Sequence, residues 1–194
     1  MESSFSSLAF IEELDRLKNV LRQTLTYDGS RSENTAEHSW HLATAVLVSA
    51  SLSDEPLNLE RTLKMALVHD VVEIDAGDTF LYDKNARNEK FEKEKAAAHR
   101  IFGLLPSPLG VELNSLWEDY EKQDCPESRF VMAFDRILPL MANFKTKGHA
   151  WKKNGVRKHQ VLEKNRKIEK SSKKLWVFAQ HLINESVRLG YLAE

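Results

Sequence analysis

The stretch from Thr62 to Asp78 constrains the fold and chemistry of this chain more than any other. It begins as an apolar helix, places His69 and Asp70 at its end, and adds Glu73 three residues later. Because the surrounding residues are mostly Met, Ala, Leu and Val, these ionisable side chains have little access to water. Burying them is costly unless they pair with each other or bind a cation. The pattern therefore predicts a metal site at the end of a buried helix.

The placement of glycine and proline predicts an all-α fold. Seven Gly and five Pro lie between segments in which apolar residues recur at helical spacing, and no alternating strands or repeats are found. With 194 residues and 42% hydrophobic content, the chain suits one core rather than two domains. We therefore expect a single-domain helical bundle over residues 1–194, with a metal-site core at about 30–145 and a basic segment and closing helix at 145–194.

Apolar spacing and capping signals give the positions of the expected helices. Asn34 to Glu37 has the form of a capping box and places His38 in the first turn of the second helix. Pro139 is expected to bend or end the helix that carries Asp135. The expected helices cover residues 4–25, 34–53, 58–70, 88–105, 108–121 and 172–190, with a loop at 79–86. A further helix is expected to start at 124–127 and to contain Phe130 to Met141.

The same spacing predicts which side chains are buried. The Glu and Lys residues of the helix at 88–105 are expected to face solvent. The predicted buried stripes are Phe10, Leu14, Leu17 and Leu21 in the first helix and Leu175, Phe178, Leu182 and Ile183 in the last.

Charge is distributed unevenly along a chain whose formal net charge is −1. Residues 145–174 hold twelve Lys or Arg against two Glu, a local charge of +10, and the remainder carries −11. This segment is expected to be a solvated helix face, with no specific nucleic-acid site because few aromatic residues are interleaved. Cys125 alone forms neither a disulfide nor a thiolate metal site. Since a signal peptide and a membrane-length apolar run are both lacking, we expect a cytoplasmic protein.

Four side chains from three expected helices suit one divalent ion. Two imidazoles and two carboxylates favour Mn²⁺, Co²⁺, Fe²⁺ or Zn²⁺ over Ca²⁺, whose sites are all oxygen. An octahedral ion would keep two positions for water or substrate, and a water bound there becomes a nucleophile near neutral pH. The candidate ligands are His38, His69, Asp70 and Asp135.

Further polar residues lie close to this set in the sequence. Glu73 falls one helical turn beyond Asp70, so it could take or give a proton. Asp78 follows a glycine on a loop and could face a ligand. Arg22 supplies a planar fork for a phosphate dianion, with Arg31 as the alternative.

The ordered pattern of these residues resembles the HD-domain metal-dependent phosphohydrolases. The finer pattern is similar to the bacterial 5′-deoxynucleotidase branch and its eukaryotic HD-domain relatives. The motifs that carry the resemblance are Leu17-Lys18 with Arg22, Arg31-Ser32-Glu33-Asn34-Thr35-Ala36-Glu37-His38-Ser39, and His69-Asp70-Val71-Val72-Glu73 followed by Gly77-Asp78.

The resemblance implies a helical homodimer that hydrolyses deoxyribonucleoside 5′-monophosphates through one divalent ion (Mn, Co, Fe, Mg or Zn). It implies that Arg22 orients the phosphate, that Glu73 assists proton transfer, and that Asp78 and Thr79 contact the sugar or phosphate. The bacterial branch has a tryptophan after the arginine, where this chain has Gln23, so the choice between deoxyribose and ribose stays open.

Two other interpretations stay open from the sequence. The chain could be an HD hydrolase of another phosphate ester or of a nucleoside di- or triphosphate, which positive charge beyond Arg22 would favour. It could also be a nucleotide-binding protein without turnover. A di-iron HD oxygenase is a third and less favoured interpretation. Such enzymes need additional histidines between the His-Asp pair and the last aspartate, and this chain offers only His99 there.

Overall fold

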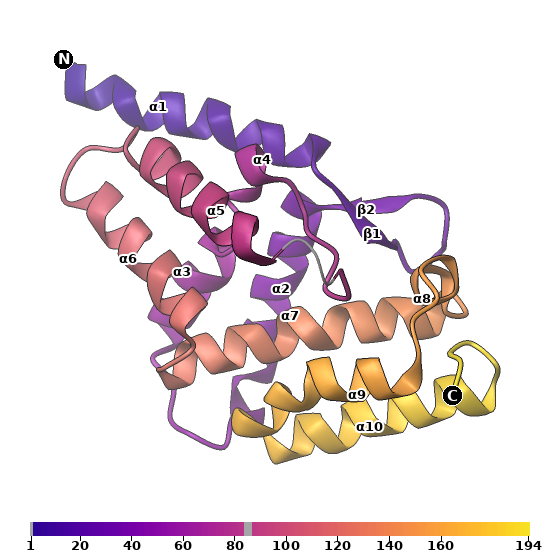
Figure 1. The fold of residues 1–194 in the computed structure, drawn as a ribbon. Helices are drawn as coiled ribbons and strands as arrows, with labels where there is room; N and C mark the ends of the chain where they lie inside the picture. Colours follow the sequence, from indigo (N-terminus) through magenta and orange to yellow (C-terminus); the bar gives the residue numbers. More distant parts are fainter. Residues whose placement is uncertain (1, 84–86) are drawn as a thin grey trace.

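The molecule is built around α7 (Pro126–Lys145), which crosses the centre of a helical bundle (Figure 1). A computed structural model describes residues 2–83 and 87–194. The predicted helical class is confirmed, with one small hairpin added to it. In chain order, the other elements are α1 (Glu2–Leu14), β1 (Leu21–Leu25), β2 (Ser32–Asn34), α2 (Thr35–Ser49), α3 (Leu59–Val68), α4 (Glu73–Ala76), α5 (Arg87–Phe102), α6 (Leu109–Lys122), α8 (His149–Lys153), α9 (Lys158–Asn165) and α10 (Lys173–Arg188), with 3-10 helices at Asp15–Asn19, Ala50–Leu52 and Arg166–Lys170.

Helix α7 is central because it carries buried apolar residues on almost all of its faces. Every residue from Phe130 to Phe134 is buried, and a helix that is apolar on all sides belongs inside a protein. Helices α2, α3, α6 and α10 pack against it. Pro139 does not end this helix, which continues to Lys145. The missing backbone bond is tolerated because Leu138 and Leu140 on either side of Pro139 are buried in the core.

The predicted first helix is wrong beyond Leu14. A 3-10 helix follows, and the chain then extends into β1, which pairs antiparallel with β2 in the register Leu21 to Asn34. The turn between the strands contains Asp28 and Gly29, and the Asp28 carboxylate accepts a bond from the backbone N–H of Ser30 at 3.1 Å. Asp-Gly between extended segments is a hairpin signal. Pairing with β2 therefore overrides the helical spacing in this segment.

The two segments that carry the His residues follow their capping signals. Asn34 accepts a bond from the backbone of Glu37, and the Glu37 carboxylate accepts one from the backbone of Asn34, so the predicted capping box is confirmed. Helix α3 ends at Val68 with His69 as its C-cap. The short helix α4 ends at Ala76 with Gly77 as its C-cap, and the φ of 75° at Gly77 turns the chain into the segment that carries Asp78.

Three expectations about burial are wrong. Leu21 is 61% exposed because it lies on the hairpin rather than on a helix. Phe178 is 40% exposed, since the buried face of α10 runs through Leu175, Leu182 and Ile183 and leaves it at the edge. In α5, Glu94 is only 5% exposed and faces the pocket described below.

Residues 84–86 of the expected loop at 79–86 lie outside the described residues. The basic segment forms α8, α9 and the 3-10 helix at Arg166–Lys170, which lie beside α7 and α10 (Figure 1). Within the ranges that the structure describes, no helix combines the length and apolar character needed to cross a membrane.

Two glycines with nearly equal φ provide a test of the packing at the C-terminal end. Gly148 has φ of 75°, and a Cβ there would lie 1.8 Å from the carbonyl oxygen of Tyr191. Gly29 has φ of 73° with nothing within 4 Å of such a Cβ. We expect Gly29→Ala to lower the free energy of unfolding by about 1–2 kcal/mol. Gly148→Ala should lower it by clearly more, because Tyr191 must move.

Urea unfolding of the two variants and the parent protein, followed by circular dichroism, measures both changes. Equal losses in the two variants would show that the approach of Gly148 to Tyr191 contributes nothing to stability.

Candidate metal centre

The four candidate ligands converge from three separate segments. One ligand atom from each of the four residues lies within 4.8 Å of the others. The two histidines are almost completely buried, at 0% and 1% exposed, and the two carboxylates are partly open to a pocket. Helix α2 supplies His38, the end of α3 supplies His69 and Asp70, and the middle of α7 supplies Asp135.

The orientation of His69 fits a ligand that presents a lone pair. Its Nδ1 lies 2.9 Å from the carbonyl oxygen of Ala66, and since a carbonyl can only accept, Nδ1 is the donor. In the neutral ring Nε2 therefore carries a lone pair, and this buried atom has no hydrogen-bond partner among the described residues. Asp70 Oδ2 lies only 3.0 Å away. Two acceptors this close need a proton or a cation between them, which a bound metal ion would supply.

His38 and Asp135 form the other half of the cluster. His38 Nε2 lies 3.2 Å from Asp135 Oδ1, while His38 Nδ1 lies 3.4 Å from Glu33 Oε2. The hydroxyl of Tyr120 donates to Asp135 Oδ2 at 3.1 Å. These neighbours hold the carboxylate in place and leave Oδ1 directed at the ligand atoms.

The electrostatic surroundings keep both candidate carboxylate ligands ionised. Burial alone would raise the pKa of Asp70, but the positive charges of His69, when its ring is protonated, and of Arg22 lower it below its ordinary value. Burial acts in the same way on Asp135, and its contact with His38 together with the charge of Arg136 holds its pKa well below the usual range. Two ionised carboxylates beside two imidazoles are a suitable donor set for a divalent transition metal.

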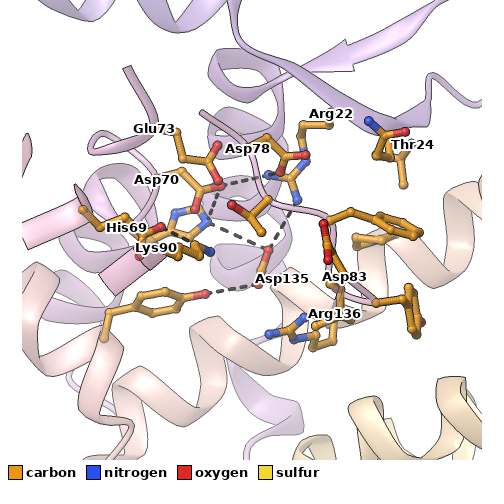
Figure 2. A pocket seen from close by; sticks show the side chains of 18 of the residues that line it. Arg22, Thr24, His69, Asp70, Glu73, Asp78, Asp83, Lys90, Asp135 and Arg136 are labelled. Atoms are coloured by element: carbon orange, nitrogen blue, oxygen red, sulfur yellow. Dashed lines mark hydrogen bonds and ion pairs between the residues drawn. The ribbon is translucent and has the colours of Figure 1, made fainter. Parts of the chain in front are cut away.

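Arg22 lies on β1 rather than at the end of a helix, and its side chain reaches the cluster (Figure 2). Its Nη1 donates to Asp70 Oδ2 at 3.0 Å, and its Nη2 lies 3.7 Å from Asp135 Oδ1. It also lies 3.6 Å from a carboxylate oxygen of Asp78. With 11% of its side chain exposed, the guanidinium is a nearly buried cation that bridges the carboxylates.

Glu73 and Asp78 lie on the same side of the pocket (Figure 2). The hydroxyl of Thr35 donates to Glu73 Oε2 at 2.9 Å. Burial and the negative charge of Asp70 raise the pKa of Glu73 well above its ordinary value. Burial likewise raises the pKa of Asp78, despite the nearby charge of Arg22. Glu73 can therefore hold a proton at a pH where Asp70 is ionised.

The cluster opens into a pocket of about 280 Å³ between α7, the hairpin and the segment after α4. Gln23 and Thr79, which the sequence predicts as substrate-binding residues, both line it. Gln23 accepts a bond from Lys153 Nζ of α8 at 3.4 Å. The rings of Phe80 and Tyr82 on the pocket wall pack edge to face, with 5.2 Å between their centroids.

Sequence reasoning missed several groups in this pocket. Lys90 pairs with Glu94 at 3.2 Å across one turn of α5, where a solvent-facing pair was expected. Tyr120 lies in a charged stretch and Arg136 in a largely apolar one, and no motif marks either residue. Thr35 is outside the pocket lining but donates to Glu73, and its sequence signal is that of the first residue of a capped helix.

Arg31, the alternative phosphate ligand, lies elsewhere. Its side chain is 56% exposed and binds the Glu37 carboxylate with both nitrogens, at 2.6 and 2.8 Å. Arg31 is not among the residues that line the pocket.

Comparison with known proteins places the chain in a family. The model of the HD domain family matches residues 14–176. The chain is 36% identical over 137 residues to the 5′-deoxynucleotidase HDDC2 of Xenopus laevis, covering 70% of this chain and 67% of that protein. The human 5′-deoxynucleotidase HDDC2 is also 36% identical over 137 residues, covering 70% of this chain and 66% of that protein. The matches thus span about two thirds of these relatives' lengths.

A solved structure agrees over the whole chain. The crystal structure of a predicted metal-dependent phosphohydrolase from Magnetospirillum magnetotacticum is 44% identical, with a TM-score of 0.94 and coverage of 100% of both chains. The fold described here is therefore the fold of that protein.

The cluster predicts a measurable metal dependence of stability. Adding Mn²⁺, Co²⁺ or Zn²⁺ to metal-stripped protein should raise its Tm. At a free metal concentration of 100 times Kd, binding should raise the free energy of unfolding by about 2.7 kcal/mol. Asp70→Asn removes one ionised donor and should abolish both the rise and the binding of one metal ion per chain, measured by mass spectrometry of metal content. The matched control is Asp75→Asn, since Asp75 pairs with Arg100 outside the cluster. Equal metal content in the two variants would contradict the site.

Proposed function

Because the chain belongs to the HD domain family of phosphohydrolases, we propose that it hydrolyses deoxyribonucleoside and ribonucleoside 5′-monophosphates to nucleoside and phosphate. The observation that carries the proposal is the placement of Arg22, whose guanidinium bridges the candidate metal carboxylates at the floor of a pocket. A phosphate dianion bound there would face a fixed, always-charged fork. The likeness to 5′-deoxynucleotidases supports the choice of substrate.

The proposed ligands of the divalent ion are His38, His69, Asp70 and Asp135. When bound, the ion would supply Lewis acidity to the phosphate and lower the pKa of a water molecule. Arg22 would bind the non-bridging phosphate oxygens, and its contact with Asp78 would hold it in position.

Glu73 is the proposed proton carrier of the reaction. Its raised pKa and its contact with the hydroxyl of Thr35 support a carboxyl that exchanges a proton while its orientation is kept. Asp78 and Thr79 line the same pocket and would contact the sugar or phosphate.

The charge of the pocket favours monophosphates over longer phosphates. Lys90 and Arg136 are cations beyond Arg22, which alone would favour di- or triphosphates, but the described lining residues include seven carboxylates against three cations. Even with Glu73 protonated, a divalent ion leaves this formal balance negative. Each additional phosphate group would therefore add repulsion rather than attraction.

A single-metal site is the better proposal than a di-iron oxygenase site. The further histidine available in sequence, His99, is exposed on α5 and is not part of the described cluster. The homodimer and the cytoplasmic location stay predictions from the sequence, as does the effect of Gln23 on sugar preference.

The proposal is tested by phosphate release from a panel of deoxyribonucleoside and ribonucleoside 5′-monophosphates, on metal-stripped protein with Mn²⁺, Co²⁺, Mg²⁺ or Zn²⁺ added back. We expect release from monophosphates, little from triphosphates, and none with Asp70→Asn. The ratio of deoxyribose to ribose substrates measures the sugar preference. Metal binding without release from any monophosphate would overturn the proposal and favour a binding protein or another phosphate ester.

The role of Glu73 is tested separately. Glu73→Gln keeps the side-chain shape and the Thr35 contact but cannot exchange a proton, so kcat should fall by about 10²–10⁴-fold while metal content stays unchanged. The matched control is Glu60→Gln on the exposed surface of α3, which should leave kcat unchanged. A Glu73→Gln variant with parental kcat would exclude Glu73 as the proton carrier.

A further inference from the structure

The guanidinium of Arg136 is an unpaired cation in the wall of the pocket. Its Nε is buried and has no hydrogen-bond partner, and among the residues that the structure describes no carboxylate oxygen lies within 4.0 Å of the guanidinium. A buried donor without a partner is destabilising, so a water molecule or a ligand is expected to complete it. Every other cation that lines the pocket has a carboxylate partner, Asp70 in the case of Arg22 and Glu94 in the case of Lys90.

Arg136 lies away from the place proposed for the phosphate. Figure 2 shows Arg22 and Arg136 on opposite sides of Asp135, and only Arg22 is joined to the cluster by dashed lines. Since neighbouring helix residues point about 100° apart, α7 directs Asp135 at the metal cluster and Arg136 along the pocket wall. A second phosphate is a poor ligand for this position, because the surrounding pocket is rich in carboxylates.

The surroundings of Arg136 suit a flat heterocycle. Phe80, Tyr82 and Pro139 line the same pocket and supply apolar and aromatic surface. Bases stack on aromatic side chains, and a guanidinium donates in the plane of a ring to carbonyl oxygen and ring nitrogen. This combination of stacking surface and an unpaired planar donor matches a nucleobase that carries a ring carbonyl.

We propose that Arg136 binds the nucleobase of the substrate by donating hydrogen bonds to a ring carbonyl, and so favours guanine and thymine over adenine. This inference rests on the proposed nucleotide substrate. Guanine presents O6 and N7 side by side as acceptors, whereas adenine presents an amino donor at the corresponding position. Arg136 is thus a specificity residue, and Arg22 with the metal ligands binds the phosphate.

The test compares dGMP, dAMP and 2-deoxyribose 5-phosphate as substrates of metal-loaded protein. Arg136→Met keeps much of the apolar stem and removes the donors, so KM for dGMP should rise about ten- to hundredfold. KM for 2-deoxyribose 5-phosphate, which has no base, should change less than twofold, and the preference for dGMP over dAMP should disappear. Arg136→Lys, which keeps the charge without the fork, should recover only part of the dGMP affinity.

Arg166→Met makes the same chemical change at a side chain that is 79% exposed, outside the pocket, and should leave all three KM values unchanged. Equal losses on dGMP and 2-deoxyribose 5-phosphate would assign Arg136 to the phosphate or the metal site and overturn the inference. Unchanged KM values in Arg136→Met would overturn it as well. Thermal unfolding of each variant identifies any general loss of structure.

Calorimetric binding of deoxyguanosine separates this inference from the proposed function, since it needs no turnover. If the parent protein hydrolyses no monophosphate, the proposed function fails, yet loss of deoxyguanosine binding in Arg136→Met would still support the base site. Absent binding to the parent protein, or equal binding to parent and variant, would overturn the base site whatever the hydrolytic activity.

Discussion

Repulsion between Asp70 and Asp135 is the interaction on which the rest of the site depends. Both carboxylates are ionised in a space from which water is largely excluded, and burial of such a pair is tolerated only with compensating charge. Arg22 supplies part of that charge through its contacts with both. The lone pair of His69 Nε2 adds a further acceptor. Three acceptors around one cation still favour a divalent ion at their centre, so metal binding is expected to stabilise the fold.

The hairpin of β1 and β2 positions the positive charge of Arg22 that Asp70 and Asp135 require. A helix continued from α1 past Leu14 would leave no β1, the strand that packs against α7 and α8 and from which Arg22 reaches Asp70 and Asp135. The backbone N–H of Thr35 donates to the carbonyl of Val20 at 3.0 Å, which joins the start of β1 to the start of α2. His38, Arg22 and the Thr35 hydroxyl are thus positioned by one short segment of backbone pairing.

Much of this arrangement can be predicted from sequence because its signals are local. The capping box at Asn34 and the apolar run ending at His69 fix two helices and the direction of their polar residues. The hairpin was missed because the helical spacing up to Leu21 outweighed the Asp-Gly turn signal. Lys90, Tyr120 and Arg136 were missed for a different reason. They contribute to the site through contacts between α5, α6 and α7, and tertiary packing of that kind has no local sequence pattern.

The distribution of charge around the pocket bears on two properties, the attraction of anionic ligands to the pocket edge and the choice between short and long phosphates inside it. Helix α8 packs beside β1 and brings Lys153 of the basic segment to Gln23 at the pocket edge. A positive rim raises the local concentration of anionic ligands, and its effect falls with ionic strength. The pocket itself is acidic. A longer polyphosphate would therefore be attracted at the rim and repelled by the carboxylates inside the pocket. In the proposed binding mode, a monophosphate would place its charge at Arg22 and the metal site and its neutral base at Arg136. Electrostatic repulsion inside the pocket would thus be enough to disfavour di- and triphosphates, without a steric barrier.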